Sequence, residues 1–217
     1  MPAVDAGSKS YGDMLFEIDV ETPGGTSRCL GVEFVDPYLY VTAGGSGSVL
    51  PNKFLVFDQS GALVHSYDQP TTSLWGWRDM AYDGQYLYAS DSININYFGT
   101  DGVVVGSFTG VLDPNRALAY DPTTDHFWTC SFTSDIYEID RSGTIIHQYT
   151  NAHSIFGFAW DDVTAGGPWI WAFGESGIYQ FDPVSGVYTG LILTTMPATH
   201  LSPGGLTFTT EWDTYED

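Results

Sequence analysis

Short segments in which apolar and polar side chains alternate run along nearly the whole chain, and they recur as a unit. The unit opens with an apolar strand and a second, aromatic-rich strand, as in Asp79–Asp83 followed by Tyr86–Ser90. A third strand ends in a tight turn with Asp and Gly, as in Ile136–Gly143, and a fourth strand follows. Alternation with a period of two predicts β-strands, and the glycine supplies the positive φ that such turns need. No stretch has the helical period, so the sequence predicts an all-β protein.

Four such units follow one another at a spacing of roughly 40 to 50 residues, which is typical of propeller blades rather than of a β-sandwich or barrel. Apolar anchors mark the first strand of each unit and of a fifth that begins near the C-terminus: Val32, Met80, Leu118, Phe158 and Leu206. We therefore predict a single domain over residues 1–217, a five-bladed β-propeller with four-stranded antiparallel blades. The blades are expected at 29–70, 74–112, 115–151 and 154–197, with a composite fifth blade from 201–217 and 12–22.

The fifth blade draws on both ends of the chain. Met14–Val20 has the position of a fourth strand, and Pro203–Phe208 has that of a first strand. Its middle strands look short or missing. Such a blade closes the ring imperfectly, or its open edges pair with a second copy of the chain, so self-association is an expectation that the sequence leaves open.

Charge excludes several classes of partner. The chain has 27 acidic and 6 basic side chains and a formal net charge of −21. Six basic residues are too few to neutralise a run of phosphates. We therefore expect neither nucleic-acid binding nor attraction to anionic membranes. No apolar stretch approaches the roughly 20 residues that span a bilayer, and the first residues show no signal-peptide pattern. Cys29 and Cys130 lie in different units, and we expect two buried thiols rather than a bridge.

Three segments carry a resemblance to a known group. Trp75–Asp83, Arg116–Asp121 and Gly157–Asp161 resemble propeller modules of large secreted bacterial surface proteins and, more broadly, the NHL/YncE-like propellers. The resemblance covers nearly the whole chain and brings no catalytic motif. It implies a secreted or cell-surface module that binds a ligand or serves as a spacer. Trp160–Asp161 lies in a first strand and lacks the Gly-His partner of WD40 repeats.

The candidate binding site is the mouth of the central channel, because the loops that lead into the first strands converge there. Arg78 and Arg116 occupy equivalent places just before two anchors, and guanidinium groups suit planar oxyanions. Aromatic rings in the same loops are surfaces on which a carbohydrate stacks, and a protein partner is the other expectation. The competing interpretation pairs both arginines with Glu33, Asp79 or Asp113 and places the aromatics in the core. The candidate ligand-binding residues are Arg78, Arg116, Trp75, Trp77, Asp79, Glu33, His153 and Phe156.

An enzyme is the alternative to a binding module. A propeller-type lyase, hydrolase or lactonase would use Glu33, Asp79, His153 or His200 around a channel-bound cation. No nucleophile elbow and no phosphate-binding glycine loop occurs, so no catalytic residue is predicted. Aspartates in turns, such as Asp121–Asp125, offer oxygen ligands to calcium, the one cofactor that the sequence leaves open. We predict an extracellular binding or interaction module, with an enzyme and a structural spacer as alternatives.

Overall fold

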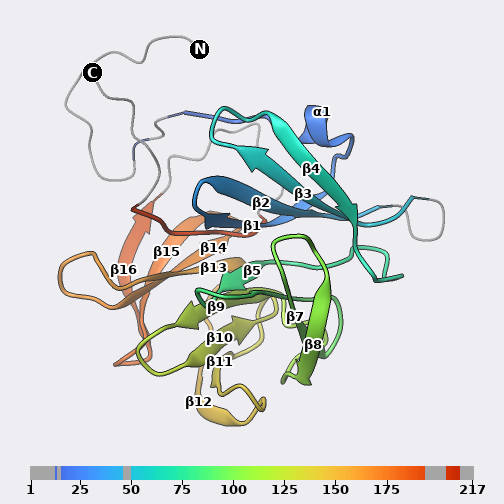
Figure 1. Cartoon of the computed structure of the whole chain (residues 1–217). Helices are drawn as coiled ribbons and strands as arrows, with labels where there is room; N and C mark the ends of the chain where they lie inside the picture. The colour runs from blue at the N-terminus through green and yellow to red at the C-terminus, as the bar shows by residue number, and fades with distance from the viewer. Residues whose placement is uncertain (1–12, 14–15, 46–49, 194–203, 211–217) are drawn as a thin grey trace.

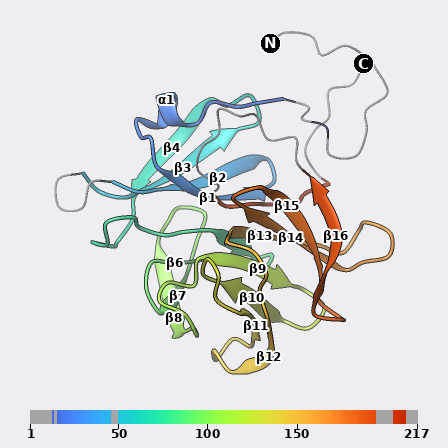
Figure 2. The same cartoon turned by 180° about the vertical axis from the view of Figure 1, so that it is seen from behind.

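The chain folds into four blades around a common centre (Figures 1 and 2). The computed structural model describes residues 13, 16–45, 50–193 and 204–210. In these residues, sixteen strands form four antiparallel sheets of four strands each. The first strand of every sheet lies near the centre and the fourth lies at the outside, as Figure 1 shows. The predicted all-β propeller with four-stranded antiparallel blades is confirmed.

The strands follow one another in chain order within each blade. A short helix, α1 (Glu21–Gly24), precedes blade 1. Blade 1 contains β1 (Cys29–Val35), β2 (Tyr38–Ala43), β3 (Lys53–Asp58) and β4 (Leu63–Asp68). Blade 2 contains β5 (Met80–Tyr82), β6 (Leu87–Ser90), β7 (Asn94–Phe98) and β8 (Val104–Thr109). Blade 3 contains β9 (Ala117–Asp121), β10 (His126–Cys130), β11 (Ile136–Ile139) and β12 (Ile145–Tyr149). Blade 4 contains β13 (Ile155–Asp161), β14 (Trp169–Gly174), β15 (Gly177–Asp182) and β16 (Val187–Leu193).

The turn between the third and fourth strands is built alike in blades 1 and 3. In blade 1, Asp58 accepts hydrogen bonds from two backbone N–H groups of the turn at 2.9 and 3.0 Å, and Gly61 has a φ of +83°. In blade 3, Asp140 accepts the equivalent pair at 2.8 and 2.9 Å, and Gly143 has a φ of +80°. The Asp-x-x-Gly signature thus sets these hairpins through contacts within each turn.

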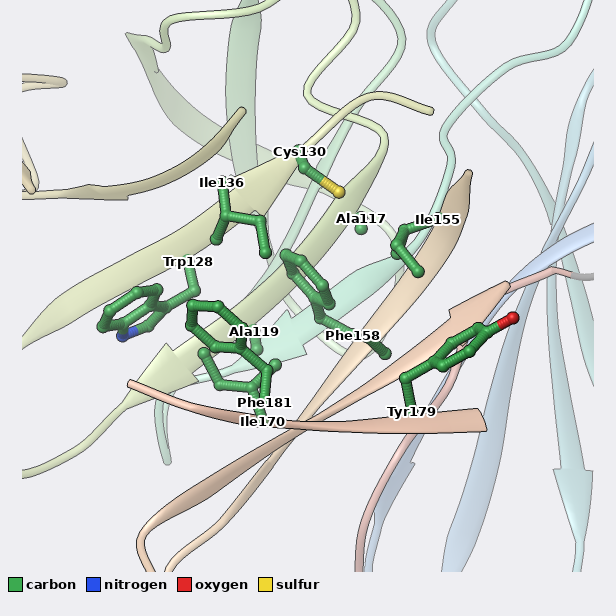
Figure 3. Close-up of a cluster of buried hydrophobic side chains, with 11 residues drawn as sticks. Ala117, Ala119, Trp128, Cys130, Ile136, Ile155, Phe158, Ile170, Tyr179 and Phe181 are labelled. Atoms are coloured by element: carbon green, nitrogen blue, oxygen red, sulfur yellow. The ribbon is translucent and has the colours of Figure 1, made fainter. Parts of the chain in front are cut away.

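The hydrophobic core lies between neighbouring blades. Trp128, Phe158 and Phe181 pack in a cluster that joins blades 3 and 4 and includes Cys130 (Figure 3). Comparable clusters join blades 1 and 2, and blades 2 and 3. In blade 1, the third strand therefore buries both faces, whereas the fourth strand is largely exposed. Cys29 and Cys130 are free thiols with no bridge between them, but only Cys130 is buried as predicted, whereas Cys29 is partly exposed.

The gap between blades 4 and 1 is filled by residues 204–210. A Cβ atom on Gly205 would meet Cα of Gly31 in β1 at 2.5 Å, and a Cβ atom on Gly157 in β13 would meet Cα of Gly205 at 2.7 Å. The segment is thus held against both inner strands, in the place predicted for a fifth first strand. Its close approach to both neighbours depends on glycine at these positions.

A buried carboxylate joins this segment to three blades. Asp79, which directly precedes β5, accepts hydrogen bonds from the backbone N–H groups of Leu118 at 3.0 Å, Phe158 at 2.7 Å and Leu206 at 3.1 Å. These donors are three of the five predicted anchors, so the alignment of the repeats has a physical counterpart at the centre of the ring. Burial raises the pKa of Asp79 well above its usual value, while the three N–H donors act in the opposite direction.

The described residues form four blades, not five, and the expected composite blade is not formed among them. Residues 204–210 carry no strand pairing in the described part of the chain, although they lie against β1 and β13. The N-terminal segment does not join them: Val20 packs against the core of blade 1, and Ile18 lies against Gly61 in the β3–β4 turn. Burial of these apolar side chains draws the segment onto blade 1 instead. Residues 14–15, 194–203 and 211–217, on which the rest of that prediction falls, lie outside the described residues.

Candidate functional site

Three arginines gather at the end of the ring where the first strands begin, which we call the entry mouth. Arg28, Arg78 and Arg116 lie just before β1, β5 and β9. Trp75 joins the first two: the guanidinium carbon of Arg28 lies 4.9 Å from its ring centroid, and that of Arg78 lies 5.8 Å away. Trp75 keeps 41% of its surface exposed. The indole therefore shields two cations on one side and remains open to solvent on the other.

Two phenylalanines hold the third arginine. The guanidinium carbon of Arg116 lies 4.1 Å from the ring centroid of Phe132 and 5.0 Å from that of Phe156. The two rings meet edge to face at 5.3 Å. Phe132 has a φ of +52°, an unusual conformation for a bulky residue, and its carbonyl accepts hydrogen bonds from Ile155 N–H and Asn151 Nδ2. Blade 4 thus holds the Phe132 ring in place at the entry mouth.

Among the residues that the structure describes, no carboxylate forms an ion pair with the arginines of the entry mouth. Within the described residues, the ion pairs of lysine and arginine are those of Lys53 with Asp68 and of Arg141 with two aspartates. No ion pair with Glu33, Asp79 or Asp113 forms there, so the interpretation in which Arg78 and Arg116 merely lock blades finds no carboxylate partner in this part of the chain. In a protein with 27 acidic side chains, this separation of charge is not what chance pairing would give.

Arg78 is the most constrained of the three. It is 8% exposed, and its Nε and Nη1 atoms, like Nε of Arg116, are buried without a hydrogen-bond partner in the described part of the chain. Burial and, to a smaller extent, the positive charge of Arg116 lower the pKa of Arg78 to about 10, while Asp91 acts in the opposite direction. Burial also lowers the pKa of Arg116, against the effect of Asp79. Both groups remain cationic at neutral pH and repel each other, so an anion beside them would stabilise both.

Other predicted site residues lie elsewhere. Trp77 is 1% exposed and stacks on Phe98 at 4.1 Å, so it is a core residue and offers no stacking surface. Asp79 has no exposed surface, and both of its oxygens accept hydrogen bonds. His153 stacks on Tyr179 at 3.8 Å, and burial lowers its pKa. His200 lies outside the described residues.

Glu33 lies at the opposite end of the first strands. It follows the anchor Val32 and lines a pocket there, together with residues that follow the other anchors. The predicted set is thus divided: Trp75, Arg78, Arg116 and Phe156 meet at the entry mouth, whereas Glu33 does not. In the described part of the chain, no group of three or more His, Cys, Asp or Glu side chains is placed to hold a metal ion.

Sequence reasoning missed Arg28 and Phe132. Arg28 lies two residues before Leu30, the position that aligns with Arg78 and Arg116, so a strict alignment of the repeats passes over it. Phe132 lies in the loop between β10 and β11, away from the loops that lead into first strands. A search for every basic residue near a first strand would have found Arg28, but the sequence carries no signal for Phe132.

Comparisons with known proteins support the fold alone. No family model matches the chain, and no curated protein sequence matches it. Among solved structures, the chain is similar to the WD40 domain of Neurospora crassa Pan2, with a TM-score of 0.52 and 12% identity. The match covers 75% of this chain and 48% of that one, so the chain spans about half the length of that relative. The fold and this likeness define the protein as a β-propeller. No described helix has the length and hydrophobicity needed to cross a membrane.

Proposed function

We propose that this chain is a binding module that holds the carboxylate of a small ligand, such as an acidic sugar, at the entry mouth. One observation carries the proposal: Arg78 is almost completely buried, yet two of its nitrogen atoms have no hydrogen-bond partner among the described residues. Leaving a buried polar group unsatisfied costs about 1–3 kcal/mol, and more when the group is charged. A protein keeps such an arrangement most readily where a ligand completes it.

The chemistry of the entry mouth suits a carboxylate on a ring. Guanidinium groups present parallel N–H donors that match the two oxygens of a carboxylate. Arg78 and Arg116 interact electrostatically, so one anion placed near both would be attracted by two charges. Trp75 and Phe132 are each 41% exposed beside these arginines, and such aromatic faces pack against sugar rings.

Isothermal titration calorimetry with glucuronate, and with glucose as its uncharged counterpart, tests the proposal. We expect glucuronate to bind and glucose to bind at least tenfold more weakly. Replacing Arg78 by Gln removes the buried charge and should weaken glucuronate binding by roughly tenfold or more, since a hydrogen bond to a charged group contributes about 1.5–3 kcal/mol.

Lys53→Gln is the matched control. It also removes one positive charge, but Lys53 already pairs with Asp68 at 2.5 Å on an exposed part of blade 1. The control should bind glucuronate as the unmodified protein does. Equal binding of glucuronate and glucose, or equal losses in the Arg78→Gln and Lys53→Gln variants, would contradict the proposal. Circular dichroism of each variant shows whether the blades remain folded.

The alternatives make different predictions. A structural spacer would bind neither sugar. An enzyme of the lyase, hydrolase or lactonase type would need its carboxylates at one site, but Asp79 is enclosed by backbone donors and Glu33 lies at the opposite mouth. The secreted or cell-surface setting remains a prediction that rests on the resemblance of the repeats.

A further inference from the structure

A second cavity lies at the end of the ring opposite the arginines, which we call the exit mouth. Its volume is about 380 Å³, within the range of pockets that bind small molecules. Residues that follow the anchors of all five units contribute to its wall. The residues used in the argument below are Glu33, Phe34, Tyr82, Tyr120, Trp160 and Phe208.

The repeat places an aromatic side chain at the same position of each unit around this cavity. Phe34, Tyr82, Tyr120, Trp160 and Phe208 are each the second residue after an anchor. The residue between anchor and aromatic is alanine in three units, including Ala119 and Ala159 in the pocket wall, so side chains do not fill the centre. The repeat therefore places an aromatic group of each unit in the pocket wall, where Tyr82, Tyr120 and Trp160 also pack against the cores between blades.

In the first unit that intermediate position is occupied by a carboxyl group. Glu33 accepts a hydrogen bond from the backbone N–H of Phe34 at 2.9 Å and another from the hydroxyl of Thr207. Among the described residues, no basic side chain forms an ion pair with it. Both donors are neutral and burial raises the pKa of Glu33 to about 8, so the carboxyl group is oriented and holds its proton at neutral pH until a cation balances its charge.

The remaining charges of the cavity are also acidic. Asp83 and Asp162 lie in its wall, and no lysine or arginine does among the wall residues that the structure describes. Asp83 is paired with Arg141 at 2.9 Å. The guanidinium carbon of Arg141 lies 5.5 Å from the ring centroid of Tyr120, which shows that this aromatic ring already accepts a cation on one face.

We propose that the exit mouth is a second binding site and that it takes an organic cation, a ligand with a primary or quaternary ammonium group. The faces of Trp and Tyr attract such a group, and the attraction grows when water is excluded. Glu33 supplies the balancing carboxylate among these rings. The two mouths have opposite character, so a cation at this end and an anion at the other occupy separate sites.

Titration with choline and with 3,3-dimethyl-1-butanol tests this proposal. The two probes share a shape and differ in the positive charge, since carbon replaces the quaternary nitrogen in the second. We expect choline to change the tryptophan fluorescence of the protein and to bind at least tenfold more tightly than the neutral probe, as measured by calorimetry. Glucose is a third probe, because a neutral hydroxyl-rich ligand is the other chemistry that aromatic walls accept.

Two variants locate the binding. Glu33→Gln keeps the shape of the side chain and removes its charge, and it should weaken choline binding by roughly tenfold or more. Glu175→Gln removes one exposed carboxylate outside this pocket, between β14 and β15, and should leave choline binding unchanged.

The proposal is overturned if choline does not bind, if the neutral probe binds as tightly, or if glucose binds in preference to choline. Comparing the probes on the unmodified protein keeps the test decisive even if a variant fails to fold. The entry-mouth proposal is tested independently: Arg78→Gln should still bind choline, and Glu33→Gln should still bind glucuronate. Equal loss of both ligands in either variant would contradict two separate sites.

Discussion

Replacement of Asp79 by Asn should destabilise the whole ring, although it changes only one oxygen to an NH₂ group. Oδ2 of Asp79 accepts the N–H groups of Leu118 and Phe158, and Oδ1 accepts that of Leu206. Asparagine has a single acceptor oxygen. If the asparagine oxygen accepts the N–H groups of Leu118 and Phe158, its NH₂ group faces the N–H of Leu206. If the oxygen accepts the N–H of Leu206 instead, the NH₂ group faces the other two N–H groups. Either orientation leaves at least one buried donor without an acceptor.

The size of the effect follows from these bonds. A hydrogen bond to a charged group contributes about 1.5–3 kcal/mol, and a buried donor left unsatisfied costs about 1–3 kcal/mol. These contributions overlap, so we expect Asp79→Asn to lower the free energy of unfolding by about 2–4 kcal/mol, a large part of the ~5–15 kcal/mol of a typical domain. Protonation of Asp79 would reduce each hydrogen bond to about 0.5–1.5 kcal/mol and so favours the lower end of this range. The direction stays the same, because a hydroxyl oxygen can still accept a hydrogen bond and an amide nitrogen cannot.

Urea denaturation followed by circular dichroism measures the loss, with Asp140→Asn as the matched control. Asp140 also accepts backbone N–H groups, at 2.8 and 2.9 Å, but it lies in the exposed β11–β12 turn, where water and the asparagine oxygen replace them. The control should lose less than about 1 kcal/mol. Hydrogen exchange should also show faster exchange at Leu206 in the Asp79 variant. If both variants lose the same stability, Asp79 does not act as a central acceptor.

Two further predictions concern charge. Arg141 donates to Asp83 at 2.9 Å in blade 2 and to Asp125 at 2.7 Å in blade 3. Arg141→Lys cannot keep both bonds, so urea denaturation should show a free energy of unfolding lower by about 1 kcal/mol for this half-exposed group. Unchanged stability would refute the link between the two blades. Burial raises the pKa of Glu33 from 4.5 to about 8, so the folded protein holds this proton more tightly than the unfolded chain does. The stability that Glu33 adds is complete below about pH 4.5 and is lost as the pH rises to about 8. Denaturation across this interval should therefore show a smaller fall in the free energy of unfolding for Glu33→Gln than for the unmodified protein. Parallel pH curves for the two proteins would contradict this expectation.

Local features of the sequence were enough to predict the blades. The period-two alternation, the aromatic second strands and the Asp-x-x-Gly turns act over a few residues, and each forms as the sequence predicted. The anchors were also predicted, because a repeated unit must place equivalent residues in equivalent surroundings. Leu118, Phe158 and Leu206 meet at Asp79 for that reason.

The number of blades was decided by packing between distant segments. The order of elements allowed both termini to share a fifth blade, but the N-terminal segment packs on blade 1 and residues 204–210 lie unpaired between β13 and β1. A strand forms only where another strand supplies its hydrogen bonds. The availability of such a neighbour is not encoded in the local pattern of either end.

The entry and exit mouths illustrate the same division. Sequence alone identified Arg78 and Arg116 as equivalent and placed aromatic side chains close to them. Only the tertiary structure decided that Trp75 faces the arginines while Trp77, two residues on, lies in the core. It also brought Phe132 to Arg116 from another loop and placed Glu33 at the opposite mouth. The physical reason is that alternation along a strand determines which side chains share a face of that strand. Whether that face meets a neighbouring blade, solvent or an open channel is decided only once the ring has closed.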